Sequence, residues 1–255
     1  MTAPTRRRVA LVTGGNRGIG RQAVLALAQR GISVIFTYNT GSAEADAVVG
    51  EADTVDVSVS ALQLDVSRPD ALPEFVERVR AELTVRDTDK FDFLLNNAGI
   101  WLTASFADTT VDDFDRLYAV NIRGVFFLTQ ALVPLMRDGG RIVNVSSGLV
   151  RFTFPMKIAY ASVKGAVEPF TRYLAAELAP RGITVNTLAP GATATDFSGG
   201  VIRDNLEYRD RVAAITALGR PAEPEDIGPV VAALFSDDLH WVNGERIEAS
   251  GGMRL

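Results

Sequence analysis

One stretch of the sequence decides the fold: Val9-Ala10-Leu11-Val12-Thr13-Gly14-Gly15-Asn16-Arg17-Gly18-Ile19-Gly20. Its apolar start, Val9–Thr13, predicts a short buried strand, and Arg17–Arg30 has apolar residues at helical spacing. Glycines between them let the backbone turn tightly and let a phosphate approach without a Cβ in the way. The N-terminus of the following helix offers free N–H groups to an anion. The stretch predicts a dinucleotide site, although a plain strand-to-helix turn has the same appearance.

The same alternation of short apolar runs and helical patterns continues to the end of the chain. Further strands are predicted at Ser33–Tyr38, Ala61–Asp65, Phe91–Asn96, Arg141–Ser146, Ile183–Leu188 and, more weakly, Glu245–Ala249. Helical patterns cover Ala43–Gly50, Pro69–Leu83, Val111–Met136, Ile158–Ala179 and Pro224–Ser236. Repeated strand–helix–strand units imply a parallel sheet with helices on both faces. With no linker or internal repeat, residues 1–255 form one α/β domain.

Composition removes several functional classes. The 255 residues contain no cysteine, which excludes disulfides, zinc–thiolate sites and cysteine nucleophiles. The single histidine, His240, excludes a multi-histidine metal site and argues against a Ser-His-Asp hydrolase. A net charge of −5 argues against nucleic acid as a partner. We therefore expect neither a metal nor a nucleic acid.

The beginning of the sequence bears on location. Arg6-Arg7-Arg8 precedes only Val9-Ala10-Leu11-Val12 before the Thr-Gly-Gly turn, whereas a signal peptide needs an apolar stretch of ~7–15 residues. No apolar run approaches the ~18–20 residues of a membrane span. We expect a cytoplasmic protein with no membrane partner.

A set of motifs in a fixed order resembles the short-chain dehydrogenase/reductase family. The spacing Thr-Gly-x-x-x-Gly-x-Gly in residues 13–20 comes first, followed by Asn96-Asn97-Ala98-Gly99, Asn121, Ser147, Tyr160-x-x-x-Lys164 and Pro190-Gly191. The resemblance covers nearly all 255 residues. It implies a single-domain Rossmann fold whose seven-stranded parallel sheet has the order 3-2-1-4-5-6-7. It also implies an oxidoreductase that forms a homotetramer or homodimer.

The chemical centre is predicted from three side chains. Tyr160 and Lys164 are four residues apart, so they share one face of a helix. Ser147 leaves the end of a predicted strand, and such ends line the ligand crevice of open α/β sheets. Reduction of a carbonyl makes an alkoxide, which needs a proton donor and hydrogen bonds. A lysine cation one turn away should favour the phenolate of tyrosine, whose free pKa is ~10.

The resemblance implies a role for each of these residues. Tyr160 transfers the proton, Ser147 steadies the carbonyl oxygen, and Lys164 bonds the nicotinamide ribose. Asn121 resembles the family asparagine that holds a water in a proton relay to the lysine. A chance Tyr-x-x-x-Lys pair, with an aromatic side chain packed beside a solvated lysine, is the alternative for the motif taken alone.

The positions that the resemblance and the strand ends assign to the cofactor run along the whole chain. They are Gly14, Asn16, Arg17, Gly18, Ile19, Gly20, Tyr38, Asn39, Asp65, Val66, Asn97, Ala98, Gly99, Tyr160, Lys164, Pro190, Gly191, Thr193 and Thr195. Asp65 could equally cap the helical segment that starts near Pro69.

The choice of cofactor rests on charge. An acidic residue at the end of the second strand would bond the adenosine ribose and repel a 2′-phosphate. Here that strand ends Thr37-Tyr38-Asn39-Thr40, with no carboxylate until Glu44, and Arg17 lies in the glycine turn. Both features favour NADP(H), with NADPH preferred over NADH. The alternative is that Arg17 is a solvated surface charge and that NAD(H) also binds.

The substrate pocket is predicted to be apolar. Its candidate residues are Trp101, Leu149, Phe152 and Phe154, with Ile100, Val150 and Met156 beside them. A lid over about residues 194–219 is expected to cover them, unless that segment is only a solvated helix pair. Such a lining favours a hydrophobic ketone or aldehyde, or its alcohol, over a sugar. Arg151 is a candidate for attracting an anionic tail such as a carrier phosphopantetheine.

The sequence therefore predicts an NADP(H)-dependent oxidoreductase that interconverts a small-molecule carbonyl and a secondary alcohol without metal. The resemblance includes 3-oxoacyl carrier-protein reductases and general ketone reductases, and the sequence does not separate them. Two alternatives stay open. One is an alcohol or sugar dehydrogenase that prefers NAD(H), and the other is a non-catalytic dinucleotide-binding sensor.

Overall fold

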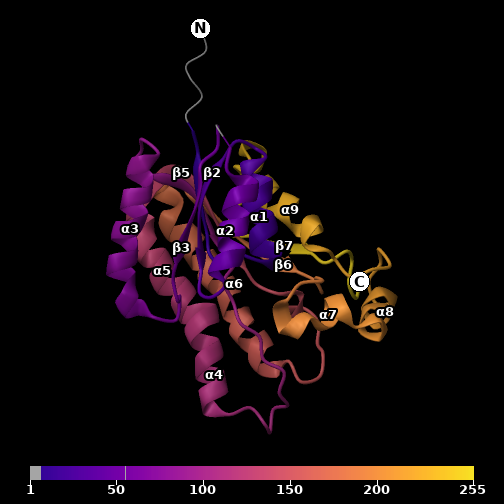
Figure 1. Cartoon of the computed structure of the whole chain (residues 1–255). Helices are drawn as coiled ribbons and strands as arrows, with labels where there is room; N and C mark the ends of the chain where they lie inside the picture. Colours follow the sequence, from indigo (N-terminus) through magenta and orange to yellow (C-terminus); the bar gives the residue numbers. More distant parts are fainter. Residues whose placement is uncertain (1–6, 55) are drawn as a thin grey trace.

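The central element is one parallel sheet. The computed structural model describes residues 7–54 and 56–255, so Arg6 of the first basic run lies outside the described residues. Within them, seven strands form the order β3-β2-β1-β4-β5-β6-β7, which confirms the predicted fold (Figure 1). The strands are β1 Val9–Val12, β2 Ser33–Tyr38, β3 Val59–Gln63, β4 Phe91–Asn96, β5 Met136–Val145, β6 Thr184–Pro190 and β7 Arg246–Ala249.

Helices cover both faces of this sheet. Figure 1 shows α3 and α5 on one side of the strands and α1 and α9 on the other, with α4 extending beyond the sheet. The helices are α1 Gly18–Ala28, α2 Ser42–Ala52, α3 Leu72–Val85, α4 Val111–Tyr118, α5 Val125–Leu132, α6 Ile158–Leu178, α7 Val201–Asp204, α8 Leu206–Ala214 and α9 Pro224–Leu234.

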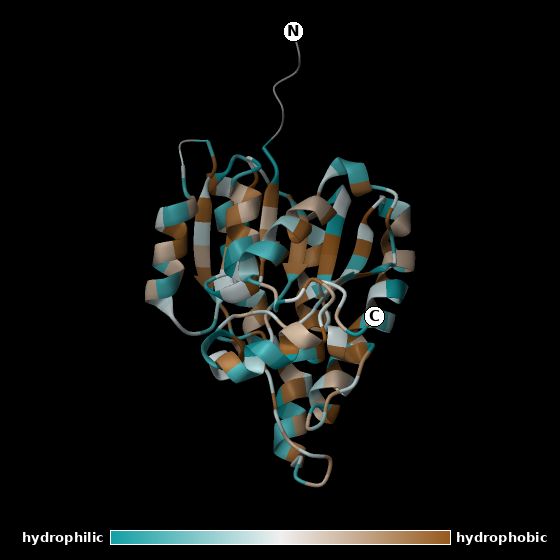
Figure 2. Cartoon of the chain, turned by 90° about the vertical axis from the view of Figure 1, so that its right-hand side faces the viewer, coloured by the Kyte–Doolittle hydropathy of each residue, from teal (hydrophilic) through white to brown (hydrophobic). Residues whose placement is uncertain are grey.

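The alternation of side chains along β1 explains the two cores. Val9 and Leu11 pack into the core under α3, α5 and α6, whereas Ala10 and Val12 pack into the core under α1, α2 and α9. All four side chains are buried. Because both faces are covered, the strands read as continuous apolar runs, which Figure 2 shows as brown ribbons between mixed helices.

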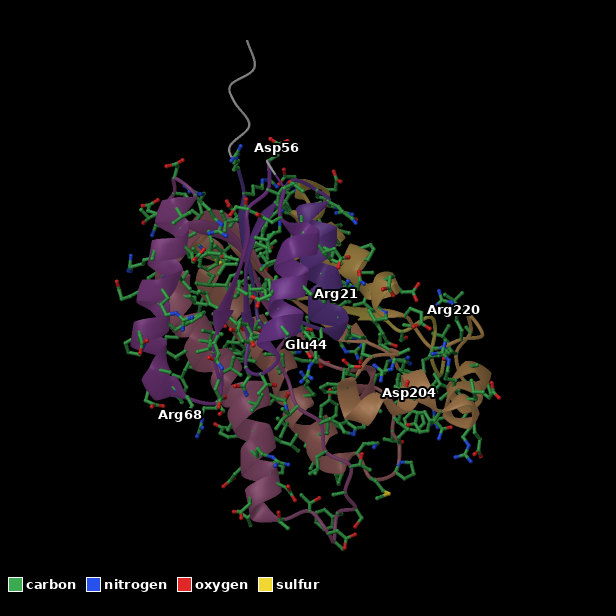
Figure 3. The ribbon with its side chains drawn as sticks, in the orientation of Figure 1. Arg21, Glu44, Asp56, Arg68, Asp204 and Arg220 are labelled. Carbon is green, nitrogen blue, oxygen red and sulfur yellow. The ribbon has the colours of Figure 1, made fainter. Side chains whose placement is uncertain are left out.

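Charged side chains lie mostly outside these cores. Arg21, Arg68 and Arg220 point away from the sheet in Figure 3, and each pairs with an acidic neighbour. Their partners are Glu51, Asp70 and Asp226, respectively. Solvent screens such exposed pairs, so they contribute little to the fold.

Several predicted element bounds are wrong by a few residues. The third strand ends at Gln63 and the fifth ends at Val145, so Asp65 and Ser147 lie in the loops beyond them. The fifth strand also begins at Met136, because Met136 pairs with Phe91 across an irregular register. The first part of this strand was missed because residues 137–140, Arg-Asp-Gly-Gly, interrupt the apolar pattern.

The predicted helix Val111–Met136 is not one regular helix. It is divided by a π-helical turn, η2, over Ala119–Gly124, and it ends in a short 3-10 turn before β5. A π turn inserts extra backbone into an α-helix and is frequent at functional sites. The sequence did not predict the π turn, since the apolar residues have a similar spacing before and after it.

The same stretch corrects the expectation about membrane spans. Val111–Leu135, with a mean hydropathy of 1.2, is long and apolar enough by length and composition alone to cross a membrane. Core helices of globular proteins pass the same test, so this is weak evidence. Leu117, Leu128 and Leu132 are buried in the cores, whereas Phe126 and Phe127 of the same stretch are exposed.

Candidate active site

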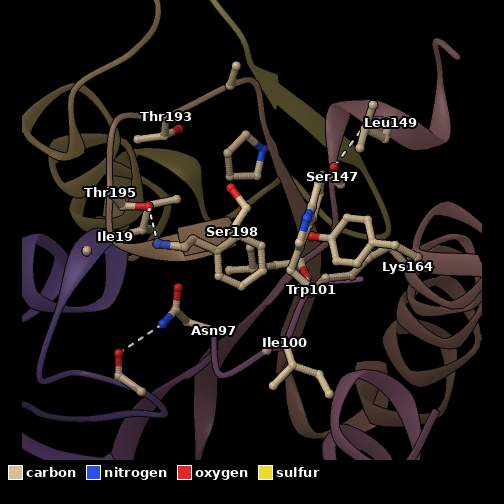
Figure 4. A pocket seen from close by; sticks show the side chains of 18 of the residues that line it. Ile19, Asn97, Ile100, Trp101, Ser147, Leu149, Lys164, Thr193, Thr195 and Ser198 are labelled. Carbon is tan, nitrogen blue, oxygen red and sulfur yellow. Dashed lines mark hydrogen bonds between the residues drawn. The ribbon is translucent and has the colours of Figure 1, made fainter. Parts of the chain in front are cut away.

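A cavity of about 520 Å³ lies where the strands end. It is lined by residues that follow β1, β4, β5 and β6, together with the chain after Ala192 and the C-terminal Met253. In Figure 4, Ser147, Lys164 and Trp101 lie toward one side of the cavity, and Ile19, Thr193 and Thr195 lie toward the other. This volume falls in the range of small-molecule and cofactor sites, roughly 300–1,000 Å³.

The glycine turn has a conformation that only glycine adopts easily. Gly14 and Gly18 have φ values of +66° and +55°. A Cβ on Gly20 would lie 2.0 Å from the carbonyl oxygen of Gly14, so α1 approaches the turn as closely as a backbone can. The turn is thus built as a cradle for a ligand and not as a simple connection.

The N-terminus of α1 fits an anion. Arg17 occupies the N-cap position, and its side chain makes no capping hydrogen bond. Thr110 caps α4 and Asn205 caps α8 with their own side chains, whereas α2, α3, α5 and α6 lack such caps, as α1 does. The uncapped N–H groups of α1 face the cavity beside Gly18 and Ile19, and a pyrophosphate would satisfy them.

Hydrogen bonds fix this turn to the end of β4. Thr13 Oγ1 accepts from the backbone N–H groups of Asn97 and Ala98, each at 2.9 Å. The Asn97 side-chain amide donates to the carbonyl oxygens of Thr13 at 2.9 Å and Gly14 at 3.1 Å. The floor of the dinucleotide end is therefore rigid before any ligand arrives.

The end of β2 has no acidic side chain facing the cavity. Thr37, Asn39 and Thr40 line it there, and Asn16 donates to the carbonyl oxygen of Thr40 at 2.9 Å. Arg17 is exposed at the rim and forms no ion pair with an acid in the part of the chain that the structure describes. This donor set fits an adenosine ribose that carries a phosphate.

Asp65 is not the cap of the helical segment near Pro69, because the N-cap position there is Arg68, but it does lie beside the predicted cofactor site. It lines the cavity beyond β3 together with Val66. Its Oδ1 also accepts from the backbone and the hydroxyl of Ser67, at 2.9 and 2.7 Å, which stabilises the turn before Pro69.

Ser147 and Tyr160 meet at the centre of the cavity. Ser147 Oγ accepts from the Leu149 backbone at 3.2 Å, and this bond is dashed in Figure 4. Tyr160 is buried, and burial raises the pKa of its phenol well above the ordinary value, while a hydrogen bond with Ser147 lowers it by less. The phenol is therefore protonated at neutral pH.

Lys164 lies one helical turn from Tyr160 and is also buried. Its Nζ donates to the carbonyl oxygen of Val145 at 2.8 Å, and burial lowers its pKa to about 8. The expected lowering of the Tyr160 pKa is not seen in the protein alone. The cost of burying the phenol dominates, so its pKa is raised.

Asn121 stands in the π turn and is completely buried. Its side chain accepts from the Ile100 backbone N–H and donates to the Ile100 carbonyl oxygen, both at 3.1 Å. It thus holds the loop that follows β4, and it does not itself line the cavity. A role in proton transfer stays a prediction.

Most predicted cofactor positions line the cavity, but Gly20 and Tyr38 do not. Gly20 is packed against Gly14 and Asn97, so it shapes the turn from behind. Tyr38 packs against the core under α1, since side chains alternate along β2 and Thr37 is the one that faces the cavity. The positions that do line it are Gly14, Asn16, Arg17, Gly18, Ile19, Asn39, Asp65, Val66, Asn97, Ala98, Gly99, Tyr160, Lys164, Pro190, Gly191, Thr193 and Thr195.

The other end of the cavity is aromatic. The Trp101 ring lies 4.6 Å from the Tyr160 ring, and Phe197 lies 5.8 Å from Trp101, centroid to centroid. All four predicted substrate residues line this end, namely Trp101, Leu149, Phe152 and Phe154. Ile100 also lines it, whereas Val150 and Met156 do not, and Met156 is half exposed.

The predicted lid segment does reach the cavity. Phe197 and Ser198 line it from the 3-10 turn Phe197–Gly200, as do Ile202 of α7 and Val212 of α8. The segment is therefore more than a solvated helix pair. Sequence motifs gave none of these residues individually, because their spacing reflects only local helices.

A network of charged side chains behind Ser147 was also missed. Arg246 of β7 donates to the Ser147 carbonyl oxygen at 3.2 Å, and it binds Glu168 of α6 and Glu248, both at 2.8 Å. Arg151 binds Glu248 through two bonds of 2.7 and 2.6 Å, and it donates to the Met253 carbonyl oxygen at 2.6 Å. The network joins the loop after β5, which carries Ser147, to the C-terminal wall of the cavity.

This network corrects the prediction for Arg151. Its guanidinium is committed to Glu248, so it is not available to attract an anionic tail. Burial opposes ionisation of Glu248, but hydrogen bonds from Arg151, Ser250 and Arg246 outweigh it and lower the pKa of that carboxyl to about 2.

Comparison with known proteins agrees with this geometry. A family described as "Enoyl-(Acyl carrier protein) reductase" matches residues 14–254. The chain belongs to the short-chain dehydrogenase/reductase family. This confirms the resemblance read from the motifs, and it makes the chain an oxidoreductase.

Individual members of the family are similar along almost their whole length. A hydroxynaphthalene reductase-like protein of Metarhizium brunneum is 38% identical, covering 96% of this chain and 94% of its own. Versicolorin reductase of Emericella nidulans is 36% identical, covering 96% and 95%. The structure of the angucycline C-6 ketoreductase LanV with bound NADP has a TM-score of 0.91 and 35% identity, covering 97% and 95%.

Proposed function

We propose that this protein is an NADP(H)-dependent ketoreductase that converts a hydrophobic carbonyl compound to an alcohol. The observation that carries the proposal is one continuous cavity. It joins the uncapped N-terminus of α1, which fits a pyrophosphate, to the hydroxyls of half-buried Ser147 and buried Tyr160. When bound, reduced NADP supplies the hydride.

Ser147 and Tyr160 supply the hydrogen bonds and the proton. Both hydroxyls donate to the carbonyl oxygen of the substrate, and Tyr160 then gives its proton to the alkoxide that forms. Because burial raises the pKa of Tyr160, the phenol carries the proton that the reductive direction needs. The opposite reaction needs the phenolate, which burial disfavours.

Lys164 and Asn121 support the tyrosine. Below its pKa of about 8, Lys164 carries a positive charge, which stabilises the negative charge left on Tyr160 after proton transfer. We assign Lys164 a second hydrogen bond to the nicotinamide ribose. Asn121 positions the Gly99–Ile100 backbone, and the π turn around it is our candidate for the path that returns a proton to Lys164.

A preference for NADPH over NADH is supported by charge. Arg17 at the rim and the absence of a carboxylate among Thr37, Asn39 and Thr40 suit a 2′-phosphate. Solved relatives were determined with NADPH or NADP bound, which agrees with this choice.

The aromatic end of the cavity supports an aromatic or otherwise apolar substrate. Trp101, Phe152, Phe154 and Phe197 offer rings to it. The names of similar proteins, among them a hydroxynaphthalene reductase-like protein, point the same way.

Self-association of the chain and a cytoplasmic location are further parts of the proposal. Large apolar side chains are exposed on α4, α5 and α6, where two copies could meet. They are Phe114, Tyr118, Phe126, Phe127 and Tyr173.

The test is NADPH consumption against a panel of aromatic and aliphatic ketones, with the Tyr160→Phe variant beside the wild type. We expect turnover by the wild type and a loss of about 10²–10⁴-fold in kcat for the variant, the usual contribution of a general acid. NADPH binding, measured by fluorescence titration, should be unchanged. Turnover that survives in Tyr160→Phe would overturn the assignment.

A further inference from the structure

Lys157 is a basic residue at the substrate end that the proposed reaction does not use. It precedes Tyr160 by three residues, at the N-terminal boundary of α6, and it lines the cavity. Its Nζ donates to Thr103 Oγ1 at 2.6 Å and lies 4.2 Å from the centre of the Trp101 ring. That ring in turn lies 4.6 Å from the Tyr160 ring. The ammonium is thus one indole away from the reacting phenol.

The positive charge of Lys157 has no acidic partner among residues 7–54 and 56–255, whereas two other charged residues at the substrate end of the cavity are paired. Arg211 pairs with Glu207, and Asp196 pairs with Arg203. Lys157 is half-buried, and burial lowers its pKa. A cation that has lost water without gaining an anion is a site prepared for one.

Hydrogen bonding around Lys157 leaves only donors free. Thr103 Oγ1 accepts from both Lys157 Nζ and Trp101 Nε1, at 2.6 and 2.8 Å, so its two acceptor positions are used. What remains is the hydroxyl hydrogen of Thr103 and two N–H groups of the ammonium. A group that meets this cluster must accept hydrogen bonds.

Building on the proposed function, we propose that Lys157 and Thr103 form a subsite for an anionic oxygen of the substrate. The substrate is then an aromatic ketone or aldehyde with a carboxylate or a phenolate on the side of its ring remote from the carbonyl. The carbonyl meets Ser147 and Tyr160, the ring packs beside Trp101 and Phe197, and the anion bonds Lys157. Lys157 is a specificity-determining residue in this arrangement.

Matched substrates test the subsite. Rates with 4-acetylbenzoate and its methyl ester are measured at saturating NADPH for the wild type, Lys157→Met and Lys157→Arg. Arg211→Met is the control, because it removes another cavity-lining charge that already has a partner. A phenolate arm uses 4′-hydroxyacetophenone at pH values above and below its ionisation.

We expect Lys157→Met to lower kcat/KM for 4-acetylbenzoate by about tenfold or more, as for the loss of a charged hydrogen bond. The rate with the methyl ester should change by less than about twofold, and Lys157→Arg should recover most of the loss. Arg211→Met should change kcat/KM for 4-acetylbenzoate and for its methyl ester by the same factor. An equal effect of Lys157→Met on acid and ester, or no effect on either, would overturn the subsite.

A binding measurement separates this inference from the proposed function. Titration calorimetry compares benzoate with benzamide on wild type and Lys157→Met, each saturated with NADPH. Benzoate binding that needs Lys157 supports the subsite even if no ketone is reduced. Equal binding of benzoate to both proteins rejects the subsite even if ketone reduction is established.

Discussion

The two ends of the cavity are built in different ways. At the dinucleotide end, backbone and glycines form the surface, and Thr13 and Asn97 bond main-chain groups to fix it. At the substrate end, side chains form the surface, and they come from the loop after β4, the start of α6, the segment after β6 and the C-terminus. The turn at the first end is one continuous stretch, fixed to the end of β4, whereas the wall of the second end is made of side chains from several separate segments.

The difference concerns tolerance to change. A Cβ on Gly20 has no room, because its nearest neighbour is the main-chain carbonyl of Gly14, which cannot move without opening the turn. A wall of side chains can change its chemistry residue by residue while the fold stays intact. We therefore expect substitutions at the dinucleotide end to abolish cofactor binding, and substitutions at the substrate end to change which substrates bind.

The largest effect is expected from Gly20→Ala. The new Cβ would lie 2.0 Å from the Gly14 carbonyl oxygen, so the turn must move. We expect a loss of about 1–3 kcal/mol in the free energy of unfolding, as for overpacking, and no measurable NADPH binding. Chemical denaturation and fluorescence titration provide the two measurements.

Gly50→Ala is the matched control. Gly50 lies inside α2 with nothing within 4 Å of the added Cβ. This variant should be as stable as the wild type or more so, by up to about 1 kcal/mol, with NADPH affinity unchanged. If Gly20→Ala binds NADPH as well as Gly50→Ala does, the description of the turn as a rigid cradle is wrong.

An intermediate effect is expected from the charged network that joins Ser147 to the C-terminal wall of the substrate end. Arg246→Met removes the donor to the Ser147 carbonyl oxygen, and we expect kcat to fall about tenfold with KM nearly constant. Arg151→Met keeps the bond of Arg246 to Ser147 but removes the hydrogen bond that holds the Met253 backbone at the cavity wall. We therefore expect substrate KM to rise with kcat nearly constant. Steady-state kinetics separate the two variants.

A merely structural role for the network would give another pattern. Both variants would then lower stability and change kcat and KM together. Arg246→Lys keeps the charge and one donor, so recovery of kcat by this variant would support a positioning role for Arg246.

The smallest effect is expected from Arg17→Ser. Arg17 is an exposed single cation, so solvent weakens its contribution. We expect the ratio of NADPH to NADH in kcat/KM to fall by roughly two- to fivefold, with the rate for NADH unchanged. Rates with both cofactors measure it. A ratio that does not move would show that Arg17 takes no part in recognising the 2′-phosphate.

The same contrast explains what could be predicted from the sequence. The order of the sheet was predicted from the resemblance to the family. Tyr160 and Lys164 were predicted from their helical spacing, and Ser147 from its place beyond a predicted strand. Gly14 and Gly18 were identified because a turn with positive φ angles favours glycine, and glycine is recognisable in the sequence.

The substrate end was predicted only in part, for a physical reason. Lys157, Phe197 and Met253 meet there because strands far apart in the sequence end at the same edge. Arg246 reaches Ser147 by pairing of β7 with β6, which no local pattern encodes. The direction predicted for the Tyr160 pKa shift was also wrong. Burial raises this pKa, and the spacing of residues along a helix does not reveal burial.

The most direct test of the central claim follows the hydride itself. NADPH carrying deuterium at the transferable C4 position is incubated with the enzyme and the best ketone of the panel. The account predicts that the alcohol carries deuterium on its carbinol carbon, and that Tyr160→Phe forms almost none of this product. An alcohol without the label, or equal labelling by the variant, would contradict it.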